Sequence, residues 1–273
     1  MRESPTEPRD HHRRAGAAYD AFAEAYDHAL ARDLWARRVL WRHHRRLFGA
    51  GDRVLDVACG TGADSLALAH RGVRVVAADL SPGMLVRLRR KSRAEDLSAR
   101  VTPVALNVER PGLAPRTPFD GIVSSFAGIN TLRDPRAFAA TAASLLRPGG
   151  RMVLHLLASP ERGGDTATRT IELGGQSVDH LLYSPRQAYR LFAPWFRLRL
   201  VYSLDGVLAP RGWAARLPVP LGTALGLLEA AASRRPPLLG RGRFSVLDLE
   251  PRPTSQESCR GGDSDPSSGR QAS

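Results

Sequence analysis

The chain has 273 residues, of which 42% are hydrophobic, so it is long enough to bury the core of a full α/β domain. Its formal net charge is +13, yet Lys91 is the only lysine among the 40 basic residues. The arginines occur as scattered pairs without interleaved aromatic residues, so we attribute the charge to a general preference for arginine codons. The charge therefore does not predict a nucleic-acid groove.

The two cysteines, Cys59 and Cys259, lie in a glycine-rich turn and in a polar tail. This placement excludes a disulfide framework and a zinc spacing, and we expect no metal site. The first 14 residues have no apolar segment of the kind found in secretory signals, and no apolar run approaches the ~20 residues that span a bilayer. We therefore expect a cytoplasmic protein without a transmembrane segment.

Residues 1–14 are polar and contain prolines, which predicts a disordered tail. Residues 15–48 predict an N-terminal helical unit, because apolar side chains recur every three or four residues. The side chains of this pattern are Tyr19, Phe22, Ala23, Tyr26, Leu34, Trp35, Val39 and Leu40.

The stretch 54–84 predicts a strand, a glycine turn, a helix and a second strand. The first apolar run ends in Cys59-Gly60-Thr61-Gly62, which is typical of a strand buried on both faces. The following helix ends at Gly72, and the second strand ends at Asp79. Two parallel strands joined in this way form a right-handed crossover, and ligands of such sheets lie beyond the carboxyl ends of the strands.

This layout favours a nucleoside ligand. Gly60 and Gly62 lack side chains where the chain turns, so a ligand can approach the backbone, and Asp79 can accept hydrogen bonds from a ribose diol. The dinucleotide fingerprint G-x-G-x-x-G fails, because Ser65 occupies the third glycine position, and no Gly-Lys-Ser/Thr phosphate loop follows. A nucleoside without a pyrophosphate fits better, and this indicates S-adenosylmethionine (SAM).

Further strands are predicted at 101–106, 119–125 and 152–157, with a helix at 138–146. Another helix begins at Ser81-Pro82, where serine is the N-cap and proline the first helical residue. Together with the first two strands they predict a nucleotide-binding core over residues 49–157.

Residues 158–250 predict the last strands of the sheet, with a helical cap inserted between them. Residues 161–176 are polar and glycine-rich, which predicts a loop, and the strands fall near 198–202 and 244–247. Between these strands, the apolar segment 213–239 is flanked by arginines. We expect an extra helix packed over the active site, while contact with a membrane surface or with a second subunit remain alternatives. Residues 251–273 predict a second disordered tail.

Four motifs, in order and with matching spacing, resemble those of class I SAM-dependent methyltransferases, specifically a bacterial small-molecule type. Asp56-Val57-Ala58-Cys59-Gly60-Thr61-Gly62 is similar to D-x-G-C-G-T-G, with Ala58 in place of one glycine. The others are Asp79-Leu80-Ser81-Pro82-Gly83-Met84, Phe119-Asp120-Gly121-Ile122-Val123-Ser124-Ser125 and Leu145-Leu146-Arg147-Pro148-Gly149-Gly150. The resemblance implies a Rossmann-like, doubly wound, mostly parallel seven-stranded sheet with an antiparallel last strand.

The resemblance also implies which residues bind SAM. Tyr19 and Tyr26 would form a lid over the cofactor, although simple packing on the sheet explains them equally well. Asn107 replaces the usual aspartate that accepts a bond from the adenine amino group, and its amide oxygen can still accept that bond. The implied cofactor-binding set is Asp56, Ala58, Gly60, Gly62, Asp79, Leu80, Met84, Asn107, Val108, Ser125, Tyr19 and Tyr26. Asn130 would either orient a substrate or cap the next helix, and we favour the cap.

The expected function is methyl transfer from SAM to a small, fairly apolar metabolite by in-line displacement. The sulfonium already activates the methyl group, so the protein supplies mainly alignment and desolvation. We assign no catalytic residue: His155, His180, Tyr183 and Asp205 are available, but none lies in a motif that requires chemistry. The alternatives are an RNA or protein methyltransferase and a SAM-binding scaffold without turnover. We expect a small-molecule partner, no nucleic acid, and a monomer or homodimer whose cap is able to contact a membrane peripherally.

Overall fold

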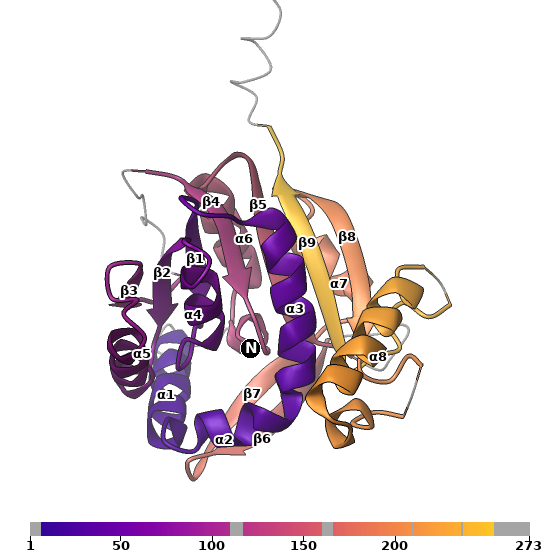
Figure 1. The fold of residues 1–273 in the computed structure, drawn as a ribbon, viewed down its shortest axis with the longest axis horizontal. Coiled ribbons are helices and arrows are strands. Elements are labelled where there is room, and N and C mark those ends of the chain that lie inside the picture. The colour runs from indigo at the N-terminus through magenta and orange to yellow at the C-terminus, as the bar shows by residue number, and fades with distance from the viewer. Residues whose placement is uncertain (1–6, 110–116, 160–165, 209, 236, 254–273) are drawn as a thin grey trace, which may run out of the picture.

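A seven-stranded sheet forms the centre of the molecule in the computed structural model (Figure 1), which describes residues 7–109, 117–159, 166–208, 210–235 and 237–253. The strand order is β3-β2-β1-β4-β5-β9-β8. In chain order these strands are β1 Arg53–Val57, β2 Arg74–Asp79, β3 Val101–Ala105, β4 Phe119–Ser124, β5 Leu146–Leu157, β8 Phe196–Leu204 and β9 Phe244–Pro251.

Strands β1 to β5 pair in parallel, whereas β9 is antiparallel to both of its neighbours, β5 and β8. The predicted α/β fold, mostly parallel with an antiparallel last strand, is therefore confirmed. β1 pairs with β2 on one side and with β4 on the other, so the chain order reverses at β1. Such a reversal opens a crevice at the carboxyl ends of the strands, where ligands of these folds bind.

Helices cover both faces of the sheet. On one face, α3 Leu34–Leu47, α4 Ala63–Ala69 and α8 Val219–Ala232 bury their apolar sides in a common core. On the other face, α6 Pro135–Leu145 and α7 Pro185–Phe192 do the same. α5 Pro82–Ala94 packs beside β2 and β3. The sheet is thus buried on both sides, which explains why its strands read as nearly continuous apolar runs.

The N-terminal unit consists of helices separated by brief breaks. They are α1 Glu7–Phe22, α2 Tyr26–Leu30, a 3-10 turn at Ala31–Asp33, and α3. The helix α1 begins at Glu7, eight residues before the predicted start, so much of the expected tail 1–14 is helical. Residues 9–15 contain no proline or glycine to end the helix, and His12 forms an ion pair of 3.0 Å with Glu109 beyond β3.

The predicted loop at 161–176 is wrong for its described part, because residues 167–182 form an antiparallel hairpin. Its strands are β6 Ala167–Leu173 and β7 Gln176–Leu182, joined by Gly174 and Gly175, whose φ angles are 55° and 77°. Two consecutive residues with positive φ form the turn that fits the twist of a two-residue hairpin. Residues 160–165 lie outside the described part of the chain, and so does the tail from 254 onward.

Helix α8 is present where an inserted helix was predicted, but it does not cover the active site. It packs against α3 and β8, on the face of the sheet. The reason is steric: Trp35 and Val39 of α3 fit against Gly226, where a side chain would come within 2.7 Å of the Trp35 ring. Among the described helices, none is long and apolar enough to cross a bilayer.

The end of α3 is fixed to the sheet through one aromatic ring. Phe48, directly after α3, is buried and lies over the backbone of Gly121 in β4. A Cβ atom placed on Gly121 would lie 2.2 Å from Cε1 of Phe48, so only glycine leaves room for the ring.

We predict that Gly121→Ala lowers the free energy of unfolding by about 1–3 kcal/mol, because the core has no space for the added methyl group. Chemical denaturation monitored by circular dichroism measures the effect. Gly49→Ala is the matched control: no atom lies within 4 Å of its Cβ position, and we expect a change near zero. Equal stability of the two variants would contradict this packing.

Candidate functional site

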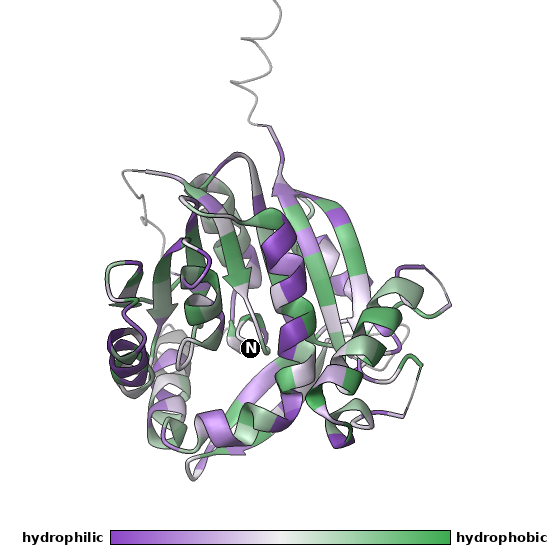
Figure 2. Cartoon of the chain, in the orientation of Figure 1, coloured by the Kyte–Doolittle hydropathy of each residue, from purple (hydrophilic) through white to green (hydrophobic). Residues whose placement is uncertain are grey.

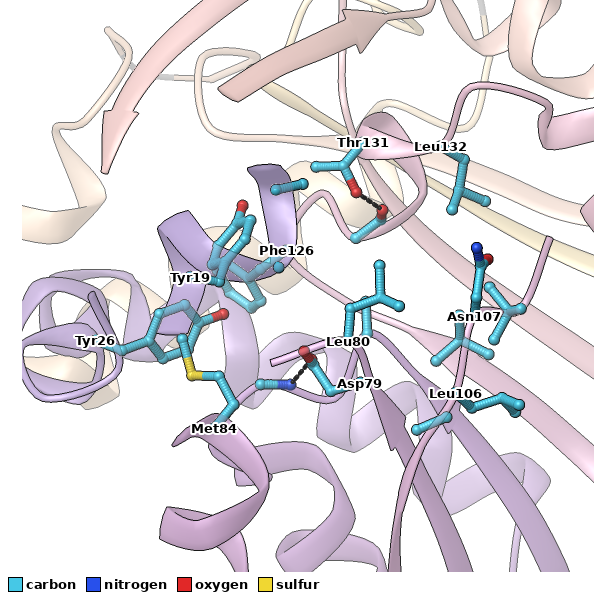
Figure 3. Close-up of a pocket in the computed structure, with 18 residues that line it drawn as sticks. Tyr19, Tyr26, Asp79, Leu80, Met84, Leu106, Asn107, Phe126, Thr131 and Leu132 are labelled. Atoms are coloured by element: carbon cyan, nitrogen blue, oxygen red, sulfur yellow. Dashed lines mark hydrogen bonds between the residues drawn. The ribbon is translucent and has the colours of Figure 1, made fainter. Parts of the chain in front are cut away.

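The pocket of interest lies at the carboxyl ends of β1, β2, β3 and β4, beneath α1 and α2 (Figure 3). It encloses about 710 Å³ of space, part of it open to solvent. Its lining is mostly apolar and consists of Ala15, Gly16, Tyr19, Tyr26, Val57, Ala58, Gly60, Ala78, Asp79, Leu80, Met84, Leu106, Asn107, Val108, Phe126, Gly128, Thr131 and Leu132.

Asp79 is the charged group of this lining, and it stands at the end of β2. Its Oδ2 accepts a hydrogen bond of 2.8 Å from the amide of Gly60, and its Oδ1 accepts one of 2.9 Å from the amide of Ser81. Burial raises the pKa of Asp79, while these backbone bonds oppose the shift. A carboxylate has about four acceptor positions, so two backbone bonds leave capacity for a ligand with hydroxyl donors.

The turn after β1 is strained at Ala58. Its φ of 53° is left-handed, a conformation that costs a residue with a Cβ about 1–2 kcal/mol. The Ala58 methyl group also faces Gly128, where an added Cβ would lie 2.6 Å from it. The glycine that the motif would have at this position adopts the same conformation without strain.

Two tyrosines of the N-terminal unit close the pocket from above. Tyr19 on α1 and Tyr26 on α2 contact each other edge to face, with ring centroids 6.5 Å apart. The Tyr26 ring lies over the glycine turn, since a Cβ on Gly60 would come within 3.2 Å of it. The Tyr19 hydroxyl lies 3.2 Å from Nε2 of His180 in β7, so the hairpin supports the lid.

Two aspartates fasten this lid to the nucleotide-binding core. Asp20 on α1 accepts bonds from the Ser81 hydroxyl and the Gly83 amide at the start of α5. Asp27 on α2 accepts a bond of 2.5 Å from the Thr61 hydroxyl in the glycine turn. It also pairs with Lys91 at 2.6 Å. Any ligand that enters beneath the tyrosines therefore has to pass a lid held by carboxylates.

The wall of the pocket formed by the residues that follow β2 and β3 is apolar, apart from the side-chain amide of Asn107. Leu80, Met84, Leu106 and Val108 provide its hydrophobic walls. Asn107 lies beside them, and its Oδ1 accepts a bond of 2.9 Å from the Glu109 amide. The second lone pair of that oxygen and the amide NH₂ group can serve a planar heterocycle with its own donors and acceptors.

Three residues of the predicted binding set do not line the pocket. Asp56 is buried below it, Gly62 is the left-handed N-cap of α4, and Ser125 lies beside the lining residue Phe126. The other nine, Tyr19, Tyr26, Ala58, Gly60, Asp79, Leu80, Met84, Asn107 and Val108, come together in the one pocket.

Asp56 belongs to a buried polar layer behind the turn. The Ser65 hydroxyl donates to its carboxylate at 2.6 Å. Nearby, Asp64 forms a buried ion pair with Arg37 and accepts a bond of 2.8 Å from Nε1 of Trp41. Burial, and then the neighbouring Asp64, raise the pKa of Asp56. These contacts join α3 and α4 to the end of β1, so this layer positions the turn from behind.

Phe126 is a lining residue that the sequence did not single out. It and Ala127 have φ angles of 53° and 70°, so the turn after β4 is strained. The Phe126 amide donates to Nδ1 of His155 at 3.0 Å, and the Arg37 guanidinium lies 4.2 Å from the centre of its ring. Strained residues of this kind concentrate at functional sites, and the motif position next to Ser125 was the available signal.

His155 is thereby a structural residue. Its Nδ1 accepts the Phe126 amide, which places the proton on Nε2, and burial lowers its pKa. The prediction that Asn130 caps a helix is wrong, because Asp134 caps α6. Asn130 instead bonds the backbone of Leu157 in β5 and of Leu181 in β7, so it fastens the hairpin to the sheet.

The remaining candidates for chemistry lie in other contacts. Asp205 is buried and pairs with Arg243 at 2.6 Å. Tyr183 is buried as well, and burial raises the pKa of its hydroxyl to about 12. Over the described ranges, no group of three or more His, Cys, Asp or Glu side chains is arranged to hold a metal ion. The geometry assigns no catalytic base.

Comparison with known proteins relates part of the chain to a protein family. Residues 54–150 match the family model described as a methyltransferase domain. This segment contains β1, β2, β3 and β4 with their helices, and most of the residues that line the pocket.

The chain is also similar to curated proteins that are named as methyltransferases. The chain is 34% identical over 151 residues to the demethylmenaquinone methyltransferase of Clavibacter sepedonicus, covering 53% of this chain and 58% of that protein. It is 38% identical over 115 residues to the ubiquinone biosynthesis O-methyltransferase of Xanthomonas euvesicatoria pv. vesicatoria, covering 41% and 46%. The chain thus spans about half the length of the curated relatives it matches.

Among solved structures, the chain is similar to the CcbJ methyltransferase from Streptomyces caelestis. The TM-score is 0.59 at 19% identity, over 86% of this chain and 98% of that one. This likeness shows that the fold extends well beyond the segment matched by the family model.

We predict that Ala58→Gly raises the free energy of unfolding by about 1 kcal/mol, because it removes the left-handed strain at the turn. Thermal and urea unfolding measure the change. Ala67→Gly in α4, where φ is not positive, is the control and should lose about 1 kcal/mol. A loss of stability in both variants would show that Ala58 is not strained.

A second prediction concerns His44, a buried residue of α3 near Asp64, in the polar layer behind the glycine turn. Neither of its ring nitrogens has a hydrogen-bond partner among the described residues, and burial lowers its pKa to about 4. Below pH 6.5 the unfolded chain therefore takes up a proton that the folded chain does not, and stability falls until about pH 4.

His44→Leu removes the histidine that titrates only in the unfolded chain. Between pH 7 and pH 4 the free energy of unfolding of this variant should therefore fall by up to about 3 kcal/mol less than that of wild type. Urea titrations at several pH values measure the difference from wild type. His70→Leu is the control, since His70 is half exposed in its ion pair with Glu95. Parallel pH profiles of wild type and His44→Leu would refute the assignment.

Proposed function

We propose that this chain, whose residues 54–150 form a methyltransferase domain of the class I, SAM-dependent kind, binds SAM in the pocket of Figure 3 and transfers its methyl group to a small, fairly apolar metabolite. The domain lies within a confirmed Rossmann-like sheet, and the pocket lies at the point where the strand order reverses.

The observation that carries this proposal is the position of Asp79 against the glycine turn. The carboxylate stands at the end of β2, bonded to the amide of Gly60 at 2.8 Å, at the edge of an otherwise apolar pocket. A ribose diol offers two adjacent hydroxyl donors that suit one carboxylate. The absence of a side chain on Gly60 lets a nucleoside lie directly on the backbone.

The rest of the lining fits the other parts of SAM. The hydrophobic walls formed by Leu80, Met84 and Val108 suit the faces of an adenine ring, and Asn107 suits its amino edge. Toward the lid, the pocket is lined by the rings of Tyr19, Tyr26 and Phe126. Aromatic faces attract cations, so they suit the sulfonium end.

When bound, SAM supplies a methyl group that its sulfonium has already activated. The chain's own residues then align and desolvate the reactants. The two lid tyrosines cover the pocket, and Asp20 and Asp27 hold them closed. We assign no catalytic base, and an electron-rich carbon acceptor would need none.

An apolar acceptor is supported by the pocket lining, in which Phe126, Gly128 and Leu132 carry no charge. It is also supported by the relatives, whose names refer to menaquinone and ubiquinone biosynthesis. An RNA or protein acceptor is less well supported, since no arginine or lysine is among the described lining residues. A cytoplasmic location and a monomer or homodimer remain predictions from the sequence.

We predict that Asp79→Ala weakens SAM binding by about 1.5–3 kcal/mol, the usual loss for a hydrogen bond to a charged group. Isothermal titration calorimetry with SAM and with its demethylated product measures the affinity. Glu95→Ala, which removes an exposed carboxylate at the far end of α5, is the control and should bind like wild type. Unchanged affinity in Asp79→Ala would place the cofactor elsewhere.

The acceptor is tested separately by incubating the wild-type chain with methyl-labelled SAM and small-molecule extracts. We expect label in an organic-extractable product, and Asp79→Ala should reduce it. Cofactor binding without any labelled product would favour a SAM-binding scaffold, and label confined to RNA or protein would contradict a small-molecule acceptor.

A further inference from the structure

A row of arginines lies along the outer side of α3, on the sheet face opposite to α6 and α7. Arg38, Arg42, Arg45 and Arg46 are all exposed there. They border two surface grooves on either side of the helix. The first groove is lined by Arg38, Arg42, Arg45 and Arg71, and the second by Arg42, Arg46, Arg151, Arg199 and Arg234. We call this surface the α3 arginine face.

Most of this charge is not neutralised by the protein itself. Arg151 pairs with Asp248, and Arg199 pairs with Glu250. The other six arginines of the two grooves make no ion pair with any described residue: Arg38, Arg42, Arg45, Arg46, Arg71 and Arg234. Among the described lining residues of the two grooves, the only acidic one is Asp248, which is buried and already bonded to Arg151 and His43. The face therefore offers guanidinium groups to an external anion.

Directly beside these arginines, α8 turns apolar side chains to solvent. Figure 2 shows the largely hydrophilic α3 next to the largely hydrophobic α8. Leu221 is 59% exposed and Leu228 is 63% exposed, and they lie on one side of α8 because they are seven positions, about two helical turns, apart. Leu227 of the same helix lines both arginine grooves, so α8 forms an apolar edge to the cationic surface. Trp213, 44% exposed, precedes α8.

We propose that the α3 arginine face and the exposed side of α8 together dock on the surface of an anionic lipid bilayer. Basic residues beside exposed leucines and tryptophan are the combination by which interfacial helices bind membranes. The grooves would hold anionic headgroups, while Leu221 and Leu228 enter the boundary of the acyl chains. This proposal does not depend on the proposed methyl transfer.

The same observations disfavour two other occupants. In a symmetric dimer through α8, the same patch of both subunits meets at the axis, so unpaired arginines would face unpaired arginines. A nucleic acid would satisfy the arginines but would leave Leu221 and Leu228 in water. Among the described lining residues, the aromatic rings available for base stacking are also poor partners: Trp41 is half-buried and bonded to Asp64, and Tyr202 is buried.

The test is co-sedimentation of the full chain with vesicles of phosphatidylcholine, with and without phosphatidylglycerol. We expect binding only to the anionic vesicles, and weaker binding as salt is raised. Each arginine near an anionic surface changes the partition coefficient roughly fivefold, so replacing Arg38, Arg42 and Arg45 by glutamine should lower it roughly a hundredfold. Replacing the same three by lysine should preserve most of the binding.

Three further variants complete the design. Leu221→Gln with Leu228→Gln should weaken binding to anionic vesicles and leave its salt dependence unchanged. Replacing Arg133, Arg136 and Arg186 by glutamine, on the opposite face around α6 and α7, removes equal charge and should leave binding within about a fewfold of wild type. Asp79→Ala should bind vesicles like wild type, which separates this proposal from the cofactor site.

Equal binding to neutral and anionic vesicles would overturn the proposal, as would equal loss in the two arginine triples. If the α3 triple instead lost affinity for RNA while vesicle binding did not change, the face would be a nucleic-acid surface. If the leucine variants altered the mass seen in analytical ultracentrifugation and not the vesicle binding, α8 would be a subunit interface.

Discussion

The hydrogen bond from the Gly60 amide to the Asp79 carboxylate joins the ends of β1 and β2, and the candidate site is built around it. Because parallel strands end at the same edge of a sheet, the turn after β1 and the acid after β2 meet without any long loop. The strain at Ala58, the tyrosine lid and the apolar walls are all arranged about this one polar contact. A carboxylate with spare acceptor capacity in an apolar pocket is what makes a nucleoside the fitting ligand.

Helix α3 contributes residues both to the protein interior behind the candidate site and to the outer arginine face. Its buried side carries Arg37, which pairs with Asp64 behind the glycine turn and stacks on the Phe126 ring. Its outer side carries the arginine face, next to α8.

Much of the fold could be predicted from the sequence, because the core strands are apolar runs closed by glycine or by polar residues. The parallel order follows from the apolar runs and the crossover between the first two strands, whereas the antiparallel last strand was expected only from the family resemblance. The β6–β7 hairpin was missed because Gly174 and Gly175 resemble loop residues unless their positive φ angles are considered. The position of α8 depends on how closely Trp35 approaches Gly226, and pattern alone does not encode that approach.

The residues of the candidate site also fall into those that the sequence predicted and those that it did not. Residues set by local motifs, such as Gly60, Asp79 and Met84, lie in the pocket, whereas Asp56 and Gly62 support it from outside. The role of Asn130 arises from contacts with two distant strands and could not be read from spacing, whereas the position of His155 within an apolar strand already favoured a buried structural role. The most direct test of the account is a crystal structure with S-adenosylhomocysteine. We predict its ribose hydroxyls on the Asp79 carboxylate and its adenine between Leu80 and Val108; density for the ligand at any other place, with this pocket closed, would contradict the account.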